Sequence, residues 1–155
     1  MTPLKLRQGE AVILLVEDNP DDEALTLIAL RDCHIGNEVA VARDGEEALD
    51  YLFRRGAYRE RSRGSDPQLV LLDLKLPKLD GLDVLRQMRQ NPATKYIPVV
   101  ILTTSSEERD LLSSYDVGAN SYIRKPVDFT QFSNAVKQLS LYWLVLNERP
   151  RGLGP

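Results

Sequence analysis

The amino-acid sequence predicts an α/β fold in which a five-stranded parallel sheet is doubly wound, with helices on both faces. Apolar runs of strand length alternate five times with segments that have helical periodicity or helix-start residues. Several of these runs end at a carboxylate or a hydroxyl side chain. Such an alternation requires right-handed crossovers between parallel strands, which bring the carboxyl ends of all strands to one edge of the sheet.

Length and composition are those of one soluble domain. The chain has 155 residues, 43% of them hydrophobic and 28% charged, with a net charge of −3. No apolar run approaches the ~20 residues of a membrane-spanning helix, and the N-terminal residues lack an apolar signal-peptide core. We therefore expect a cytoplasmic protein that does not contact membranes. Charges of both signs are interspersed, so nucleic acid is not an expected partner.

The sequence contains one cysteine, Cys33, and one histidine, His34. This excludes structural disulfides and Cys/His zinc sites, and it leaves no spare partners for a Ser-His or Cys-His nucleophile relay.

The strands are identified by their apolar patterns. Residues 11–16 and 69–72 are continuous apolar runs, which is typical of strands buried on both faces. Residues 38–43 alternate as in a half-buried edge strand. Residues 98–103 are the fourth predicted strand, which begins with a proline, a residue that is tolerated at the first position of a strand. Residues 121–125 are predicted to form a short fifth strand.

The first three helices carry start or stop signals. Asn19 can cap a helix that has proline at its first position and runs to about residue 33. Asp44 caps a second helix that stops near Gly56. After the central strand, apolar residues at helical spacing predict a short helix over residues 82–90.

A surface loop is expected between Gly56 and Pro67, where the chain is rich in Arg, Gly, Ser and Asp. The densest basic cluster lies between Arg54 and Arg63 and is interrupted by Glu60. We interpret it as a solvated loop.

The last two helices follow the fourth and fifth strands. Ser105 and Glu108 have the spacing of a capping box for a helix that closes near Gly118, and Asp128 caps the final helix. Residues 141–146 are consecutively apolar, so one side of this helix cannot face the same core, and a second copy of the chain is the simplest cover. The expected dimer surface consists of Leu141, Tyr142, Leu144 and Val145.

Four of the five strand ends carry side chains suited to chemistry: Glu17 with Asp18, Asp73, Thr103 and Lys125. Three neighbouring carboxylates repel one another unless a cation neutralises them, and an incompletely filled oxygen site suits Mg²⁺, which accepts phosphate oxygens. A phosphoryl group is then the natural incoming group. Asp73 is the candidate nucleophile, while Thr103 and Lys125 would stabilise phosphoryl charge.

These residues resemble the receiver domains of two-component response regulators. The similarity rests on the Glu17-Asp18 pair, the segment from Asp73 to Gly81, the strand-end Thr103 and Lys125-Pro126, and it covers about residues 10–147. It implies a flavodoxin-like (βα)5 fold with sheet order 2-1-3-4-5 and an extended C-terminal helix. It also implies Mg²⁺-dependent phosphoryl transfer from a sensor histidine kinase to Asp73, followed by slow hydrolysis, in a signalling protein rather than an enzyme.

The resemblance further implies that the backbone carbonyl of Lys75 completes the metal site and that the bond between Lys125 and Pro126 is cis. Thr103 and Tyr122 correspond to the conformational switch of receivers. Two positions depart from the common pattern, Glu17, where many members have Asp, and Thr104, where a smaller residue is common. We expect both departures to alter rates rather than abolish function.

A closer similarity links residues 17–23, the segment 51–56 and the end of the last helix to single-domain regulators associated with bacterial phytochromes. Many of those proteins form homodimers through the last helix. The expected organisation is therefore an N-terminal arm (1–10), a receiver domain (11–147) and a tail (148–155) without an output domain. A phytochrome is the expected kinase partner.

Several alternatives remain open from the sequence. The chain could serve another kinase of a chemotaxis or phosphorelay type, or act as an unphosphorylated scaffold through its dimer surface. A flavin-binding protein of this architecture would need a Ser/Thr/Gly-rich loop after the first strand, where this chain has acids. A phosphatase with an aspartate nucleophile usually has an acid at the position that Lys75 occupies here.

Overall fold

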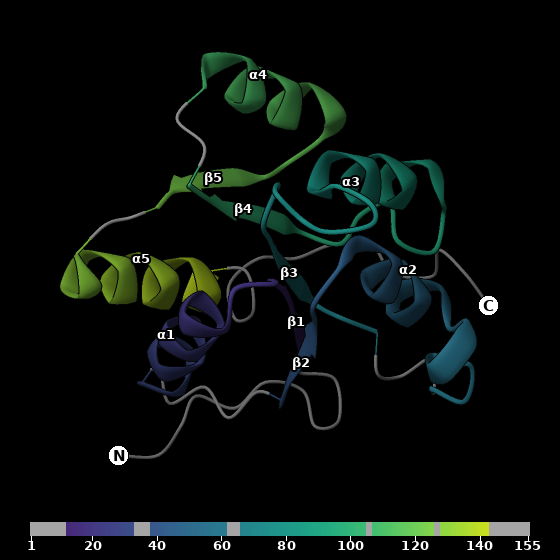
Figure 1. The fold of residues 1–155 in the computed structure, drawn as a ribbon, viewed down its shortest axis with the longest axis horizontal. Helices are drawn as coiled ribbons and strands as arrows, with labels where there is room; N and C mark the ends of the chain where they lie inside the picture. Colours follow the sequence, from purple (N-terminus) through teal and green to yellow (C-terminus); the bar gives the residue numbers. More distant parts are fainter. Residues whose placement is uncertain (1–11, 33–37, 62–65, 105–106, 126–127, 143–155) are drawn as a thin grey trace.

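The structure is a computed structural model that describes residues 12–32, 38–61, 66–104, 107–125 and 128–142 (Figure 1). Five strands form one sheet: β1 (Val12–Val16), β2 (Glu38–Ala42), β3 (Leu69–Leu72), β4 (Val99–Thr103) and β5 (Ser121–Arg124). All neighbouring strands are parallel, in the order β2-β1-β3-β4-β5. The predicted fold class, sheet order and edge position of the second strand are confirmed.

Helices cover both faces of the sheet: α1 (Pro20–Asp32), α2 (Gly45–Phe53), α3 (Gly81–Gln90), α4 (Glu108–Val117) and α5 (Phe129–Leu141). A short 3-10 helix, η1 (Gly56–Tyr58), follows α2. Helices α1 and α5 lie side by side on one face, and α2 and α3 lie on the other (Figure 1).

Alternation along the strands divides the core into two clusters. In β1, Ile13 and Leu15 pack in the cluster that contains Phe132 and Val136 of α5. The intervening Leu14 packs in the other cluster with residues of α2 and α3. Successive strand side chains point to opposite faces, so a run that is apolar throughout, such as that of β1, fits a strand covered on both sides.

Three predicted helix caps are confirmed. Asn19 Oδ1 accepts hydrogen bonds from the backbone N–H groups of Asp21 and Asp22 at 2.9 and 3.1 Å. The carboxylate of Asp44 accepts from the N–H of Glu47 at 2.7 Å. The carboxylate of Asp128 likewise accepts from the third residue after it, at 2.9 Å. These oxygens satisfy N–H groups that have no partner within the helix.

Two boundaries differ from the prediction. Helix α2 ends at Phe53 because Arg54 adopts a left-handed conformation with φ of 54°, and the expected stop near Gly56 is instead the start of η1. Helix α4 has Glu107 at its N-cap, without a side-chain cap hydrogen bond. The predicted cap Ser105 lies outside the described residues.

The basic loop after α2 differs from the expected solvated loop. The Arg61 side chain is only 8% exposed, because it packs over the Tyr51 ring and donates to the carbonyl oxygens of Tyr51 and Leu52. Asp66 pairs with both Arg61 and Arg54, at 2.9 and 2.8 Å. These contacts supply side-chain donors to carbonyl groups near the end of α2, where the helix itself offers few N–H donors.

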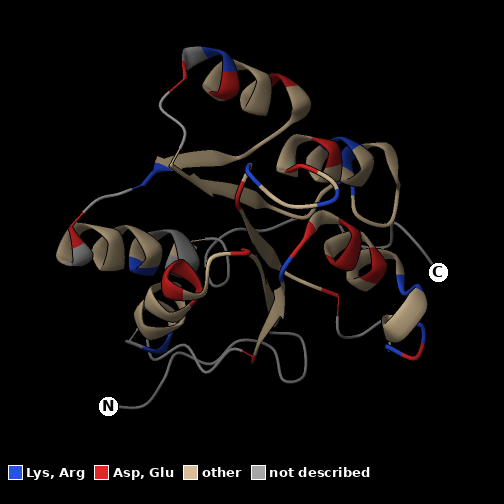
Figure 2. Cartoon of the chain, viewed as in Figure 1, with Lys and Arg blue, Asp and Glu red and all other residues tan. Residues whose placement is uncertain are grey.

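Acidic and basic residues are interspersed over the described elements (Figure 2). Within this part of the chain, the helices are all too short or too polar to cross a membrane. Of the predicted dimer surface, Leu141 is the last residue of α5 and Tyr142 is 48% exposed. Leu144 and Val145 lie outside the described residues, as do the N-terminal arm, the C-terminal tail and Pro126.

Candidate functional site

The sheet itself positions three of the predicted site residues. Just beyond the strand ends, the N–H of Glu17 donates to the carbonyl of Ala42 at 2.9 Å, and the N–H of Asp73 donates to Val16 at 3.1 Å. The N–H of Lys125 donates to the carbonyl of Thr103. Because the hydrogen-bond ladder continues past the strands, the backbones of these residues are fixed at one edge of the sheet.

Three carboxylates meet at this edge. Glu17 and Asp73 are 2% and 8% exposed, whereas Asp18 is exposed. One carboxylate oxygen from each lies within 4.8 Å of the others. The structure therefore brings together the three acids that the sequence predicted.

Lys125 is the cation of this cluster. Its Nζ lies 2.8 Å from Glu17 Oε1, 3.0 Å from Asp22 Oδ2 and 3.9 Å from Asp73 Oδ2. Burial alone lowers the pKa of the Lys125 ammonium, but hydrogen bonds to Glu17 and Asp22 and the charge of Asp73 outweigh it, so the net pKa is raised. Lys125 is therefore a charged, buried lysine.

The pKa of Glu17 indicates that the positive charge of one lysine does not fully compensate the negative charge of the three carboxylates. Burial and the neighbouring Asp73 raise the pKa of Glu17 to about 8, despite the opposing effect of Lys125. Its second oxygen, Oε2, is buried and has no hydrogen-bond partner among the described residues. An all-oxygen donor set with an unsatisfied buried carboxylate oxygen fits a hard divalent cation.

A glycine allows the loop after β3 to pass close to Asp73. The N–H of Gly81 donates to the carbonyl of Leu74 at 2.9 Å, and a Cβ on Gly81 would overlap the carbonyl oxygen of Asp73. Asp80 caps α3 by accepting from the N–H of Asp83 at 3.0 Å. The Asp-Gly pair thus starts α3 and leaves room for the backbone that carries Asp73.

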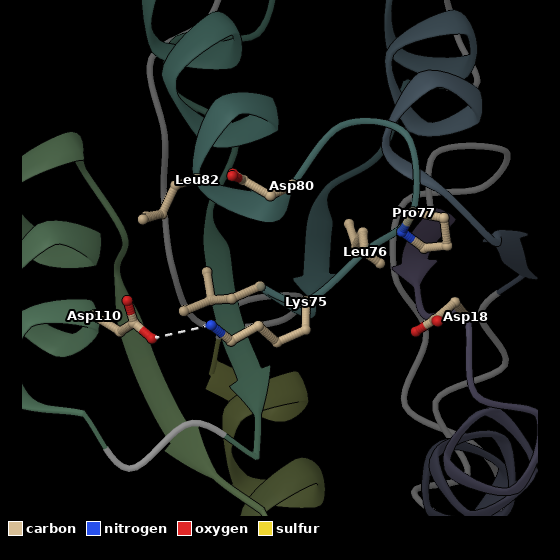
Figure 3. Close-up of a pocket in the computed structure, with 8 residues that line it drawn as sticks. Asp18, Lys75, Leu76, Pro77, Asp80, Leu82 and Asp110 are labelled. Atoms are coloured by element: carbon tan, nitrogen blue, oxygen red, sulfur yellow. Dashed lines mark ion pairs between the residues drawn. The ribbon is translucent and has the colours of Figure 1, made fainter.

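A pocket of about 370 Å³ opens beside the acids (Figure 3). Asp18, Asp80 and Asp110 contribute carboxylates to its lining, and Leu74, Leu76, Pro77 and Leu82 contribute apolar atoms. Lys75 extends across it toward α4, where its Nζ lies 3.7 Å from Asp110 Oδ2. The N–H of Lys75 also donates to Asp73 Oδ1 at 3.2 Å.

The two predicted switch residues lie on neighbouring strands. Thr103 is fully buried, and Tyr122 is partly buried against the cluster that contains Ile101. Tyr122 pairs in register with Ile101, two residues before Thr103. Side chains two residues apart in a strand share a face, so Thr103 and Tyr122 belong to the same face of the sheet.

Sequence reasoning missed two acids near the site, Asp22 and Asp110. Asp22 could have been noticed because it lies in the first turn of a helix whose cap, Asn19, directly follows Asp18. No comparable signal exists for Asp110, because its approach to Lys75 depends on how α4 packs.

Five parallel strands in the order 2-1-3-4-5, with three acids and a lysine at their carboxyl ends, define a receiver domain. The chain matches the family described as "Response regulator receiver domain" over residues 13–137 and belongs to it.

Its relatives include other response regulators. The response regulator Rcp1 of Synechocystis sp. is 41% identical over 133 residues, which cover 86% of this chain and 88% of Rcp1. The solved Mn²⁺-bound form of Rcp1 has a TM-score of 0.81 at 39% identity, covering 90% of this chain and 99% of that one.

Two further solved structures are similar. The phosphorylated cyanobacterial phytochrome response regulator RcpA has a TM-score of 0.83 at 42% identity and covers 91% of this chain and 99% of its own. The bacteriophytochrome response regulator AtBRR is 55% identical, with a TM-score of 0.72, and the match covers 89% of this chain and 98% of AtBRR. This chain is therefore a signalling receiver domain homologous to phytochrome response regulators.

Proposed function

We propose that this chain accepts a phosphoryl group on Asp73 from a phosphohistidine of a sensor kinase. The observation that carries the proposal is the meeting of Glu17, Asp18 and Asp73 with the buried Lys125 at one sheet edge. A carboxylate beside a cation site and a fixed ammonium is suited to attack a phosphoryl group, whose charge both cations can stabilise.

Glu17, Asp18, Asp73 and the backbone carbonyl of Lys75 would hold Mg²⁺, which supplies charge neutralisation for the phosphoryl oxygens. An Asp73 carboxylate oxygen attacks phosphorus, the P–N bond to the histidine breaks, and the imidazole nitrogen retains the electron pair. The product is an aspartyl phosphate. Later attack by water on phosphorus breaks the new P–O bond and returns the Asp73 carboxylate and inorganic phosphate.

Thr103 and Lys125 would bind phosphoryl oxygens through their hydroxyl and ammonium groups. Movement of Thr103 toward the phosphoryl group would release space that Tyr122 could enter. The shared sheet face of these two residues supports this switch.

A phytochrome is the kinase partner that we propose. The names of RcpA and AtBRR associate these homologous proteins with phytochromes, and RcpA was solved in a phosphorylated form. The metal in the Rcp1 structure is Mn²⁺, and we propose Mg²⁺ for this chain because it prefers oxygen ligands and accepts phosphate oxygens.

Intact mass measured after incubation with acetyl phosphate and Mg²⁺ tests the phosphoacceptor role. We expect one added phosphoryl group on the wild type and none on Asp73→Asn or in excess chelator. Phosphotransfer from a purified phytochrome kinase tests the partner separately. Absence of any adduct on the wild type, together with no binding of beryllofluoride, would contradict the proposed function.

A further inference from the structure

Asp22 contacts Lys125 but is not one of the three clustered acids. It lies in the first turn of α1, and its Oδ2 is 3.0 Å from Lys125 Nζ. The Lys125 side chain is 8% exposed and that of Asp22 is 30% exposed. Among the described residues, the other carboxylates near this ammonium belong to Glu17 and Asp73.

The position of Asp22 is fixed by its own helix. The N–H of Asp22 donates to the cap Asn19 at 3.1 Å, and its carbonyl accepts from the hydroxyl of Thr26, a residue that is 2% exposed, at 2.8 Å. Helix α1 in turn packs against α5. The backbone of Asp22 is therefore fixed at a place from which its carboxylate reaches the lysine.

Glu17 and Asp73 have a second task in the proposed function, because they are also the candidate ligands of the divalent cation. An ammonium that had only these two partners would compete with the cation for the same oxygens. Asp22 gives Lys125 a carboxylate that lies outside the cation site.

We propose that Asp22 is a positioning residue, which holds the Lys125 ammonium at the margin of the site and keeps it away from Asp73 and from the second oxygen of Glu17, Oε2. This inference rests on the proposed function of the same site. Without the Asp22 charge, Lys125 moves from its 3.9 Å separation closer to Asp73, cation binding weakens, and the nucleophile is held in an ion pair.

The first test is Mg²⁺ binding to the unphosphorylated protein, measured by isothermal titration calorimetry. We expect Asp22→Asn to weaken Mg²⁺ binding about fivefold, since the freed ammonium competes at short range, and we expect Asp22→Glu to restore most of the affinity. Asp21→Asn is the matched control. Asp21 lies in the same turn, is exposed, and makes no contact with Lys125 among the described residues.

A double-mutant cycle separates positioning from a direct effect of the Asp22 charge on the cation. In a Lys125→Met background, we expect Asp22→Asn to change Mg²⁺ affinity no more than Asp21→Asn does. The proposal is overturned if Asp22→Asn weakens binding equally with and without Lys125, or if it behaves like Asp21→Asn in the wild-type background.

A spectroscopic measurement tests the contact without metal or phosphoryl donor. The side-chain ¹⁵Nζ resonance of Lys125, assigned by its loss in Lys125→Met, should shift in Asp22→Asn and remain in place in Asp21→Asn. An unchanged resonance in Asp22→Asn would overturn the proposal.

The last test is the rate of phosphorylation by acetyl phosphate at saturating Mg²⁺. We expect Asp22→Asn to react about tenfold more slowly than the wild type, because a small displacement of a positioned group is costly in rate, and we expect Asp21→Asn to be unchanged. If the wild type is never phosphorylated but the resonance and Mg²⁺ results hold, the proposed function fails while the positioning of Lys125 by Asp22 stands.

Discussion

Glu17 occupies an environment that a carboxylate tolerates only with a cation nearby. It is almost fully buried, its Oε1 contacts Lys125, and its Oε2 has no hydrogen-bond partner among the described residues. The Glu17 side chain reaches both the buried lysine and the candidate cation site.

Mg²⁺ affinity should depend on pH through Glu17. Burial and Asp73 raise the pKa of Glu17 to about 8 in the metal-free protein, so below this pH the group is mainly protonated and must lose its proton to bind a cation. We expect affinity to rise from pH 6.5 to 8, by at most about tenfold per pH unit, and to level off above pH 8. Calorimetric titrations at several pH values measure this dependence.

Glu17→Gln is the control for this prediction. It removes the titrating group, so Mg²⁺ binding should be weaker but nearly independent of pH over the same range. Equal slopes in the wild type and in Glu17→Gln would show that another group is responsible.

At the scale of elements, the connection from α2 to β3 is organised around Arg61. Its guanidinium lies 4.3 Å from the centre of the Tyr51 ring and donates to the carbonyls of Tyr51 and Leu52, near the end of α2. Tyr51 also packs edge-to-face against Tyr58, whose hydroxyl donates to Glu47 at 2.6 Å. A long, basic segment is thereby anchored to the second helix.

Arg61→Ala should lower the free energy of unfolding by about 2 kcal/mol, because it removes buried packing, the hydrogen bonds to the Tyr51 and Leu52 carbonyls and one of the two ion pairs of Asp66. Urea denaturation measures the change. Arg59→Ala is the matched control, since the Arg59 side chain is 75% exposed, and it should cost no more than about 0.5 kcal/mol. Equal losses in the two variants would contradict an anchoring role for Arg61.

The start of α3 is a second place where one residue determines an element. A Cβ at Gly81 would overlap the carbonyl oxygen of Asp73, which is backbone and cannot rotate away. Gly81→Ala should therefore destabilise the fold by about 2 kcal/mol and slow phosphorylation, because it displaces the loop that carries Asp73. Urea denaturation and mass analysis of the acetyl phosphate reaction measure the two effects, and wild-type values for both would contradict this explanation.

At the scale of the whole molecule, the sequence predicts self-association. Residues 141–146 are consecutively apolar, more than one packed helix face requires. We expect the wild type to be a dimer by multi-angle light scattering and Leu144→Lys to be a monomer. Gln138→Lys, which adds the same charge at an exposed position of α5, should remain a dimer. A monomeric wild type at tens of micromolar would contradict the prediction.

Local sequence signals are sufficient to predict the element order and most of the candidate site. Continuous apolar runs identify β1 and β3, and the caps Asn19, Asp44 and Asp128 mark helix starts, because these signals depend on neighbours within a few residues. Parallel topology then requires that Glu17, Asp73 and Lys125 share one edge. These features needed no knowledge of packing.

The partners of the charged side chains, in contrast, depend on how distant segments pack together. The contact of Asp22 with Lys125 joins residues 103 positions apart, and the approach of Asp110 to Lys75 depends on the placement of α4. The burial of Arg61 likewise reversed the expectation of a solvated loop. The positions of charged residues in the sequence do not predict which distant charges they contact. Their pairing follows from the packing of helices and loops rather than from local sequence.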